Sequence, residues 1–303
     1  MEEKKKNRVP VVLIIIFIII LAALYAYLYL LPGISDSRSR TVVVNYATIQ
    51  AYSENKCIVV RNETVYKTHY GGSVSYYSKE GEKTRQGTMV ADVYSAVNRE
   101  SISTETTGTV SFFIDEKEDF FTPESFASLD PEEIASMEDI IPQSVENKEA
   151  GEDSAVFKLV TSDIWYLLII NETKSDQQLK IGQSIIAEFP GEDRVPAVIS
   201  DINEGTDHIL YLAEIHAYYE KSPQLRSVDV KIISSEESGL LIPTSAITSN
   251  GENIGVYVLS AGGDYIFKPI EIITQTKDET LIEEGGSVRL YDEVLKDARN
   301  FKN

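Results

Sequence analysis

The sequence contains only one cysteine among its 303 residues, at Cys57. A single cysteine excludes an internal disulfide, so each folded part must be stabilised by its own hydrophobic core. Cys57 lies in the apolar run KCIVV. We expect it to be a buried structural thiol, because free cysteine packs in proteins as a small hydrophobic residue.

Histidine is also scarce, with three residues in the chain: His69, His208 and His216. None lies in the spacing of a zinc motif such as His-Glu-x-x-His, and there is no cysteine pair. The chain also lacks a Gly-x-Ser-x-Gly nucleophile motif, a phosphate-binding glycine loop and a dinucleotide-binding fingerprint. We therefore predict no catalytic residue, no metal site and no cofactor, and we assign structural or surface roles to the three histidines.

Basic residues are outnumbered, with 28 Lys and Arg against 48 Asp and Glu, which gives a formal net charge of −20. A surface this acidic repels phosphate backbones, so we do not expect nucleic acid as a partner. The most acidic short run is DEKED, from Asp115 to Asp119. It lacks the glycine and the ligand spacing of a calcium loop, and we interpret it as a solvated turn.

One long apolar run is present, from Val9 to Leu31, with 23 residues and no charge. A helix of this length covers the roughly 30 Å of a bilayer core, and the run is too long for the apolar region of a signal peptide. Four basic residues precede it, Lys4, Lys5, Lys6 and Arg8. The positive-inside rule therefore predicts a single-pass protein of the cell membrane, with its N-terminus in the cytoplasm and its bulk extracytoplasmic.

Strand patterns dominate the rest of the chain. SVDVKII, residues 227–233, alternates apolar and polar positions, and the two apolar runs around Ala261–Asp264 predict a hairpin. Pro196, within RVPAVIS, predicts an edge strand or a bulge. The best helix signal is LDPEEIASMEDI, where Asp130 can cap the helix and Glu133 can complete a capping box.

Two six-residue stretches follow one pattern, GSVSYY from Gly72 and GTVSFF from Gly108: glycine, a hydroxyl residue, valine, serine and two aromatic residues. Gly81 and Gly87 follow the first copy at turn spacing, where a positive φ is needed. Each copy offers an apolar strand face that is too small to be buried alone. We predict that the copies form two halves of one β structure, with a shared core that includes Val74, Tyr76, Val110 and Phe112.

The run GGSVSYYSKEGEKTRQGTMVADV resembles the first lipoyl-like half-motif of the membrane fusion proteins, or periplasmic adaptors, related to the HlyD-type adaptors and to those of RND pumps. TGTVSFFIDEKEDFF resembles the second half-motif. Similar pieces follow in the family's order over roughly residues 41 to 295, and VVRNETV resembles a Gram-positive subgroup. The half-motif residues that we single out are Gly72, Val74, Gly81, Gly87, Gly108 and Val110.

The sequence departs from the family's pattern in two ways. Lipoyl carriers present a modifiable lysine between the half-motifs, but VYSAVNRESIS, from Val93 to Ser103, has none. Most adaptors also insert a long α-helical hairpin there, whereas about ten residues join the half-motifs here. Such a connector can only turn the chain between adjacent strands, so we expect the partners to lie near the protein's own membrane.

The resemblance implies a mostly-β fold in which an N-terminal transmembrane helix precedes three β modules. The segments we expect are a cytoplasmic tail (1–8), the helix (9–31), a linker (32–40), a barrel-sandwich hybrid (41–160) with a short acidic helical insert (about 123–140), a β-barrel (161–235) and a membrane-proximal β module (236–303). In the family the chain runs outward and returns, so residues 41 to 60 are expected to pair with the C-terminal modules.

The implied function is that of a non-catalytic, membrane-anchored adaptor or scaffold of a transporter or export complex. Its partners would be a cell-membrane transporter or an envelope-complex protein, and the lipid bilayer through residues 9–31. The homo-oligomeric state stays open. The alternative is a structural envelope or cell-division scaffold that uses the same fold without transport, and a membrane-anchored hydrolase is a third class.

Overall fold

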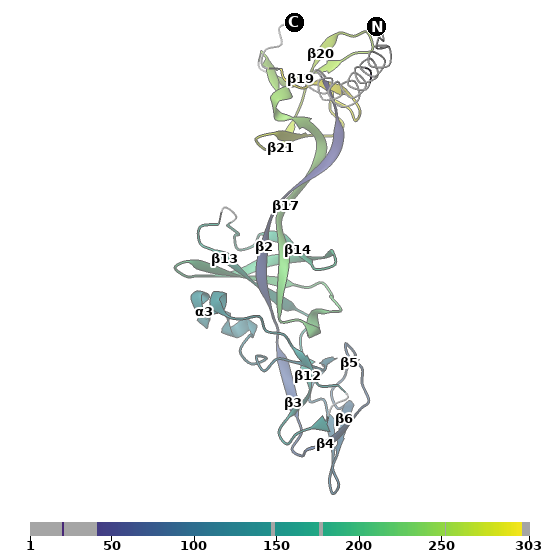
Figure 1. Cartoon of the computed structure of the whole chain (residues 1–303), viewed down its shortest axis with the longest axis vertical. Coiled ribbons are helices and arrows are strands. Elements are labelled where there is room, and N and C mark those ends of the chain that lie inside the picture. The colour runs from purple at the N-terminus through teal and green to yellow at the C-terminus, as the bar shows by residue number, and fades with distance from the viewer. Residues whose placement is uncertain (1–19, 21–40, 147–148, 176–177, 252, 299–303) are drawn as a thin grey trace, which may run out of the picture. The chain divides into compact units, whose positions relative to one another are not determined.

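The computed structural model describes residue 20 and residues 41–146, 149–175, 178–251 and 253–298 (Figure 1). Strands dominate this part of the chain, as predicted. It forms two compact units, one from Gln50 to Glu236 and one that combines the residues up to Ile49 with those from Glu237 onward. Apart from Ile20, the predicted spanning segment 9–31 lies outside the described residues. Among the residues that are described, no helix has the length and apolar character needed to cross a bilayer.

The first part of the larger unit is a sandwich of two antiparallel four-stranded sheets. One sheet has the order β3 (Glu63–Lys67), β12 (Ala155–Val160), β8 (Gly108–Ser111), β5 (Lys83–Thr84). The other has the order β11 (Glu149–Ala150), β4 (Gly72–Tyr76), β6 (Met89–Tyr94), β7 (Arg99–Ser103). Buried apolar side chains from both sheets form one core. A short pair, β9 (Phe113–Ile114) with β10 (Gln143–Ser144), follows the second repeated stretch.

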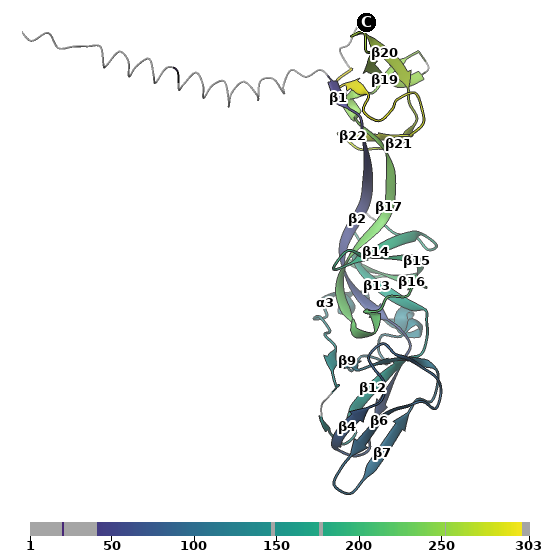
Figure 2. The same ribbon diagram turned by 90° about the vertical axis from the view of Figure 1, so that its right-hand side faces the viewer.

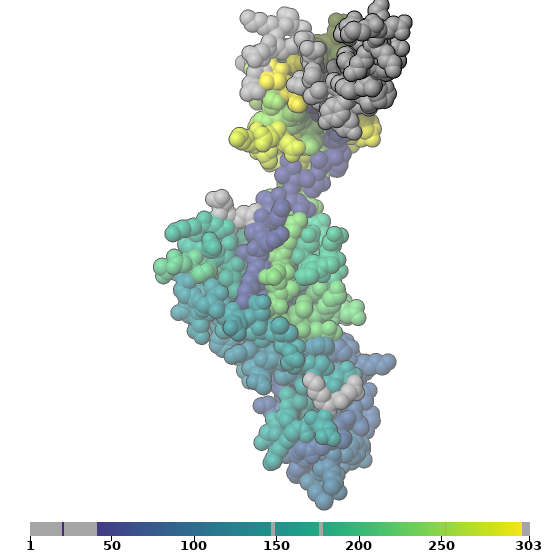
Figure 3. All heavy atoms as spheres, in the orientation of Figure 1, coloured from purple at the N-terminus to yellow at the C-terminus, as the bar shows by residue number. Residues whose placement is uncertain are grey.

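The second part of the larger unit is a closed barrel. Its strands follow the order β14 (Ser184–Phe189), β15 (Asp193–Glu204), β16 (His208–Ile215), β13 (Trp165–Glu172), β2 (Asn45–Val60), β17 (Ser227–Pro243), and β14 pairs with β17 to close the ring. Figure 3 shows the neighbouring strands β2, in purple, and β17, in green, along one face of this barrel. Cys57 is fully buried inside it, as expected, and Trp165 packs in the same core against Phe189 and Tyr219.

The predicted helical insert forms two short helices, the 3-10 helix η2 (Pro123–Ser128) and the α-helix α3 (Pro131–Ser136). Asp130 caps α3 by accepting from the backbone N–H groups of Glu132 and Glu133. The capping box, however, belongs to η2, where Thr122 and Ser125 bond reciprocally. Phe126 and Ile134 of these helices pack against the barrel strands in a second core, so the insert covers one outer face of the barrel.

The prediction of an edge strand or a bulge around Pro196 is confirmed in part. Strand β15 as a whole lies between β14 and β16. The shift in its register with β16 comes after Pro196, between Ile199 and Asp201. Pro196 itself pairs with Ile186 of β14, whereas the pairing of β15 with β16 begins only at Val198. Proline cannot donate a ladder hydrogen bond. It is accommodated here because this part of β15 has a paired neighbour on one side alone.

The smaller unit is also built from strands. Its main sheet contains β1 (Thr41–Val43), β23 (Glu293–Leu295), β19 (Asn253–Leu259), β18 (Thr248–Asn250) and β20 (Tyr265–Pro269). The end of β17 pairs with β22 (Glu279–Ile282), which pairs with β21 (Ile272–Gln275). Strands β19 and β20 form the predicted hairpin, and two 3-10 turns, η3 (Ser222–Gln224) and η4 (Thr244–Ala246), complete the two units.

The first and the last described strands of the chain are paired with each other. Thr41 lies opposite Leu295 and Val43 opposite Glu293, in the small unit that Figure 2 shows around β1 and β19. The expectation that the chain start pairs with the C-terminal module is therefore confirmed for β1. Strand β2 lies between β13 and β17 in the barrel sheet, and its residues 57–60 pair with β13.

Candidate functional site

The two repeated stretches lie in different sheets of the sandwich and face one core. Val110 and Phe112 are fully buried, and Val74 and Tyr76 pack against the same cluster. The rings of Tyr76 and Phe112 meet edge to face with centroids 4.6 Å apart. The Tyr76 hydroxyl donates to the carbonyl oxygen of Val145 at 3.0 Å. The shared core therefore joins side chains from both copies of the repeat.

The first glycine of each copy is required by the close approach of another backbone. A Cβ on Gly72 would lie 2.0 Å from the carbonyl oxygen of Tyr94, and one on Gly108 would lie 2.4 Å from that of Val160. The other two half-motif glycines have positive φ, +75° at Gly81 and +81° at Gly87. The repeat is therefore a constraint on the backbone, since side chains at these four positions are disfavoured for steric or conformational reasons.

The connector between the half-motifs is a tight hairpin, as predicted. Strand β6 ends at Tyr94, β7 begins at Arg99, and the N–H of Ser95 donates to the carbonyl oxygen of Asn98 at 2.9 Å. Val97, at the tip, is 87% exposed. The place where the family's helical hairpin would be inserted thus carries a four-residue turn.

A polar cluster centred on Asp92 stiffens the outer face of this hairpin. The buried carboxylate of Asp92 accepts from the hydroxyls of Tyr77 (2.6 Å), Tyr94 (3.0 Å) and Ser101 (2.5 Å) and from the guanidinium of Arg99 (2.6 Å). These donors, Arg99 first, lower the pKa of Asp92. Because the carboxylate is satisfied, Tyr77, Tyr94 and Arg99 are held in place while they remain exposed. They form a rigid aromatic and cationic surface.

A second polar cluster, which we call the buried ion network, lies where the sandwich meets the barrel. It consists of Arg61, Glu63, Asp115, Glu118, Lys158 and Arg226. Their side chains are 0% exposed except for that of Glu118, at 3%. Three cations face three carboxylates, so the network is neutral, as a water-excluded site requires.

Lys158 and Arg226 connect the carboxylates of the network. The Lys158 Nζ lies 2.8 Å from Glu63 Oε1, 3.5 Å from Glu118 Oε1 and 3.7 Å from Asp115 Oδ2. Arg226 reaches Asp115 Oδ2 with Nε at 2.9 Å and also donates to Glu63 Oε2. Lys158 and Arg226 therefore each bridge at least two carboxylates.

The protonation of the network follows from these contacts. Burial by itself would raise the pKa of Glu63, but Arg61, Arg226 and Lys158 lower it to about 2. Burial lowers the pKa of Lys158, and the attraction of Glu63 opposes that shift. The pKa of Arg226 is raised because Glu63 and Asp115 outweigh its burial. Glu63 is therefore ionised at neutral pH, opposite the cations that lower its pKa.

The interpretation of Asp115–Asp119 as a solvated turn is wrong for two of its residues. Asp115 and Glu118 point into the ion network, and the N–H of Asp115 donates to Glu118 Oε1 at 2.9 Å. Only Glu116, Lys117 and Asp119 are exposed. The partners of Asp115 and Glu118 are distant in the chain: Lys158 lies on β12, and Arg226 directly precedes β17. No local sequence pattern predicts these contacts.

Main-chain bonds reinforce the junction around the network. Arg61 donates to the carbonyl oxygens of Ser222, Pro223 (3.3 Å) and Leu225 (3.0 Å) on the barrel side. On the sandwich side, Ser111 also donates to the Pro223 carbonyl oxygen at 3.3 Å. The network and these bonds hold sandwich and barrel together as parts of one compact unit.

The three histidines lie on separate elements, and each faces a glutamate. His69 lies 2.6 Å from Glu100, His208 2.5 Å from Glu132 and His216 2.6 Å from Glu214. The hydrogen bond to Glu100 raises the pKa of His69. In the described ranges, no group of three or more His, Cys, Asp or Glu residues is placed to hold a metal ion. The histidines thus take part in local pairs.

Comparison with known proteins identifies the two parts of the larger unit. The family model described as RND related, barrel-sandwich hybrid domain matches residues 63–161, and the one described as RND related, beta-barrel domain matches residues 165–236. No curated protein matches.

Three solved structures illustrate the degree of structural similarity. ZneB from Cupriavidus metallidurans has 9% identity and a TM-score of 0.38, over 87% of this chain and 94% of that one. MacA from Actinobacillus actinomycetemcomitans has 11% identity and a TM-score of 0.34, over 85% and 99%. The membrane fusion protein Spr0693 from Streptococcus pneumoniae R6 has 9% identity and a TM-score of 0.33, over 60% and 100%. From the two family-model matches, the larger unit therefore contains an RND-related barrel-sandwich hybrid domain followed by an RND-related β-barrel domain.

Proposed function

We propose that the protein is a non-catalytic adaptor or scaffold that works with a cell-membrane transporter or export complex. The observation that carries this proposal is the tandem of an RND-related barrel-sandwich hybrid and an RND-related β-barrel. The buried ion network supports it, because a scaffold must hold its domains at a fixed angle to one another if it is to keep its partners in place. The described residues offer paired or buried titratable groups and a packed core, which suit a structural role.

Membrane attachment and orientation are part of the proposal. The uncharged run 9–31 would span the bilayer, with residues 1–8 in the cytoplasm and the units outside. Residues 32–40 then lead directly to β1, so the smaller unit would be the membrane-proximal module. Protease added to intact spheroplasts should digest the chain beyond about Arg40. Full protection in cells that remain sealed would contradict this orientation.

The short β6–β7 hairpin supports partners that lie close to the protein. An arm that crosses a periplasm needs tens of helical residues at 1.5 Å each, and the turn here has four residues. The proposed partners therefore lie at the protein's own membrane, and we expect a Gram-positive source. Lateral association in the bilayer is expected to drive assembly, including any homo-oligomer. Replacing residues 9–31 by an unrelated spanning helix should weaken it.

The second candidate is an envelope or cell-division scaffold, and the same hairpin favours it, because that role also needs no long arm. Crosslinking of intact cells followed by purification of the full-length protein separates the two. Recovery of a transporter subunit supports the first function, and recovery of division proteins without a transporter supports the second. A control with Tyr94 and Arg99 replaced by alanine tests whether the hairpin surface contributes to capture.

A further inference from the structure

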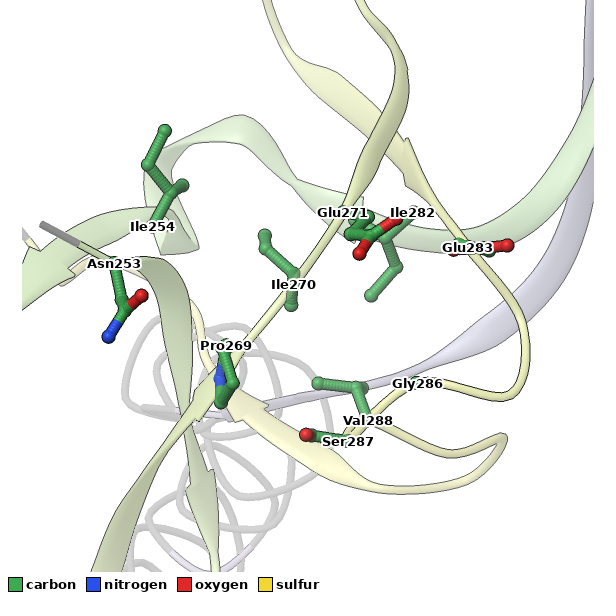
Figure 4. A pocket seen from close by; sticks show the side chains of 10 residues that line it. All are labelled: Asn253, Ile254, Pro269, Ile270, Glu271, Ile282, Glu283, Gly286, Ser287 and Val288. Atoms are coloured by element: carbon green, nitrogen blue, oxygen red, sulfur yellow. The ribbon is translucent and has the colours of Figure 1, made fainter.

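The smaller unit contains a cavity of about 450 Å³ at one end of its core (Figure 4). Ile270, Ile282 and Val288 line the cavity and also belong to or pack against the hydrophobic core of this unit. Ile254, half exposed, extends the apolar lining outward. The cavity is therefore an opening into the core, and an apolar side chain that entered it would continue the packing of the core.

The charge of the cavity has one sign. Glu271 and Glu283 line it, and the lining within the described residues includes no Lys, Arg or His. In Figure 4, Glu271 lies beside Ile282, while Glu283 lies at the margin. Neither carboxylate has an ion-pair partner in the part of the chain that the structure describes. An occupant that is complementary to this site combines an apolar group with cations.

A segment of this kind precedes β1 in the sequence. Strands β1 and β19 are both antiparallel to β23, with Val42, Val294 and Val258 in line, so β1 and β19 are parallel. The described chain therefore enters β1, at Thr41, on the side at which β19 begins, and Asn253 and Ile254 at the start of β19 line the cavity. The segment that precedes Thr41 carries Ile34, Arg38 and Arg40.

We propose that linker residues 34–40 dock in this cavity, with Arg38 and Arg40 facing Glu271 and Glu283 and Ile34 against the apolar lining. Three extended residues reach about 10 Å, and the arginine side chain adds to that reach. Because the segment is tethered to β1, its local concentration is high, so weak ion pairs suffice to hold it. On the proposed membrane anchor, the docked linker leaves only Pro32 and Gly33 between the bilayer and this unit, which fixes its height.

Disulfide trapping in the full-length protein in detergent tests the docking. Cys57 is the only native cysteine and is fully buried, so it does not compete. The test pair is Ser39→Cys with Ser287→Cys, at the cavity, and the matched control is Ser39→Cys with Ser260→Cys, beyond the opposite end of β19. We expect the test pair to form its disulfide at least about tenfold faster than the control. Equal rates would overturn the proposal.

The ion pairs are tested in the same assay. Glu271→Gln with Glu283→Gln should slow the test pair about threefold, and so should about 0.5 M salt, since exposed ion pairs are weak and screened. Exchanging the signs, with Arg38→Glu and Arg40→Glu against Glu271→Lys and Glu283→Lys, should restore the rate. If the rate of disulfide formation does not respond to these changes, the assigned contacts are contradicted. Saturable binding of dodecyltrimethylammonium to the cavity without trapping of Ser39→Cys would assign it to a separate cationic ligand and overturn the proposal.

Discussion

Replacing Arg226 by methionine removes one cation from the buried ion network and puts an unbranched apolar side chain in its place. The substitution breaks the 2.9 Å contact to Asp115, the contact to Glu63 and the 2.8 Å bond to the carbonyl oxygen of Val59. Lys158 remains 3.7 Å from Asp115 and 2.8 Å from Glu63, but a single ammonium cannot replace the two directed contacts of a guanidinium. A buried carboxylate is left without full compensation.

The magnitude follows from the burial of these groups. Removing one partner of a buried ion pair typically costs about 3–5 kcal/mol, because the remaining charge has lost its water and its partner. The larger unit runs from Gln50 to Glu236. For a unit of this size, 1 kcal/mol corresponds to a change in Tm of about 2–4 °C. The expected decrease in Tm for Arg226→Met is therefore about 10 °C.

The measurement is thermal unfolding of the full-length protein in detergent, followed by circular dichroism and by limited proteolysis. Arg194→Met is the matched control, because Arg194 lies on the same barrel, pairs with Glu236 and is 39% exposed. An exposed ion pair contributes at most about 1 kcal/mol, so the control should shift Tm by no more than a few degrees. Equal shifts for the two variants would refute the reasoning that burial makes the network important.

Three further results are expected. Acid should destabilise the larger unit as the pH falls from about 4.5 to about 2, because the pKa of Glu63 in the folded state lies near 2. The expected loss in the free energy of unfolding is about 3 kcal/mol. A wild-type protein without this pH dependence would contradict the assignment. Gly72→Ala should destabilise the sandwich by more than about 2 kcal/mol in urea unfolding, and Ser73→Ala should change little, since a Cβ at Gly72 meets the Tyr94 carbonyl. Val110→Asp should unfold the sandwich, seen as rapid proteolysis, and a protease-resistant variant would show that the shared core is not essential.

Local chemistry in the sequence determined much of this fold. The alternation of apolar residues marked the strands, and the paired glycine stretches marked two halves of one sandwich, because a strand face and a tight turn depend on residues that are neighbours in the chain. The count of residues between Tyr94 and Arg99 was sufficient to predict a hairpin turn instead of a helical arm. Asp130 and Pro131 likewise marked the start of α3.

Only the tertiary structure decided which charged residues are buried. In the sequence, Asp115 and Glu118 belong to a charged run that looks solvated. They are buried because Lys158 and Arg226 lie against them, and these residues are 43 and 111 positions away from Asp115. Pro196 predicted an edge strand or a bulge, and only the sheet pairing shows that β15 has a partner on one side alone at Pro196. Ion pairs and sheet order depend on residues that are distant in sequence, and the free energy of a buried charge depends on the whole shell around it, which no short stretch of sequence contains.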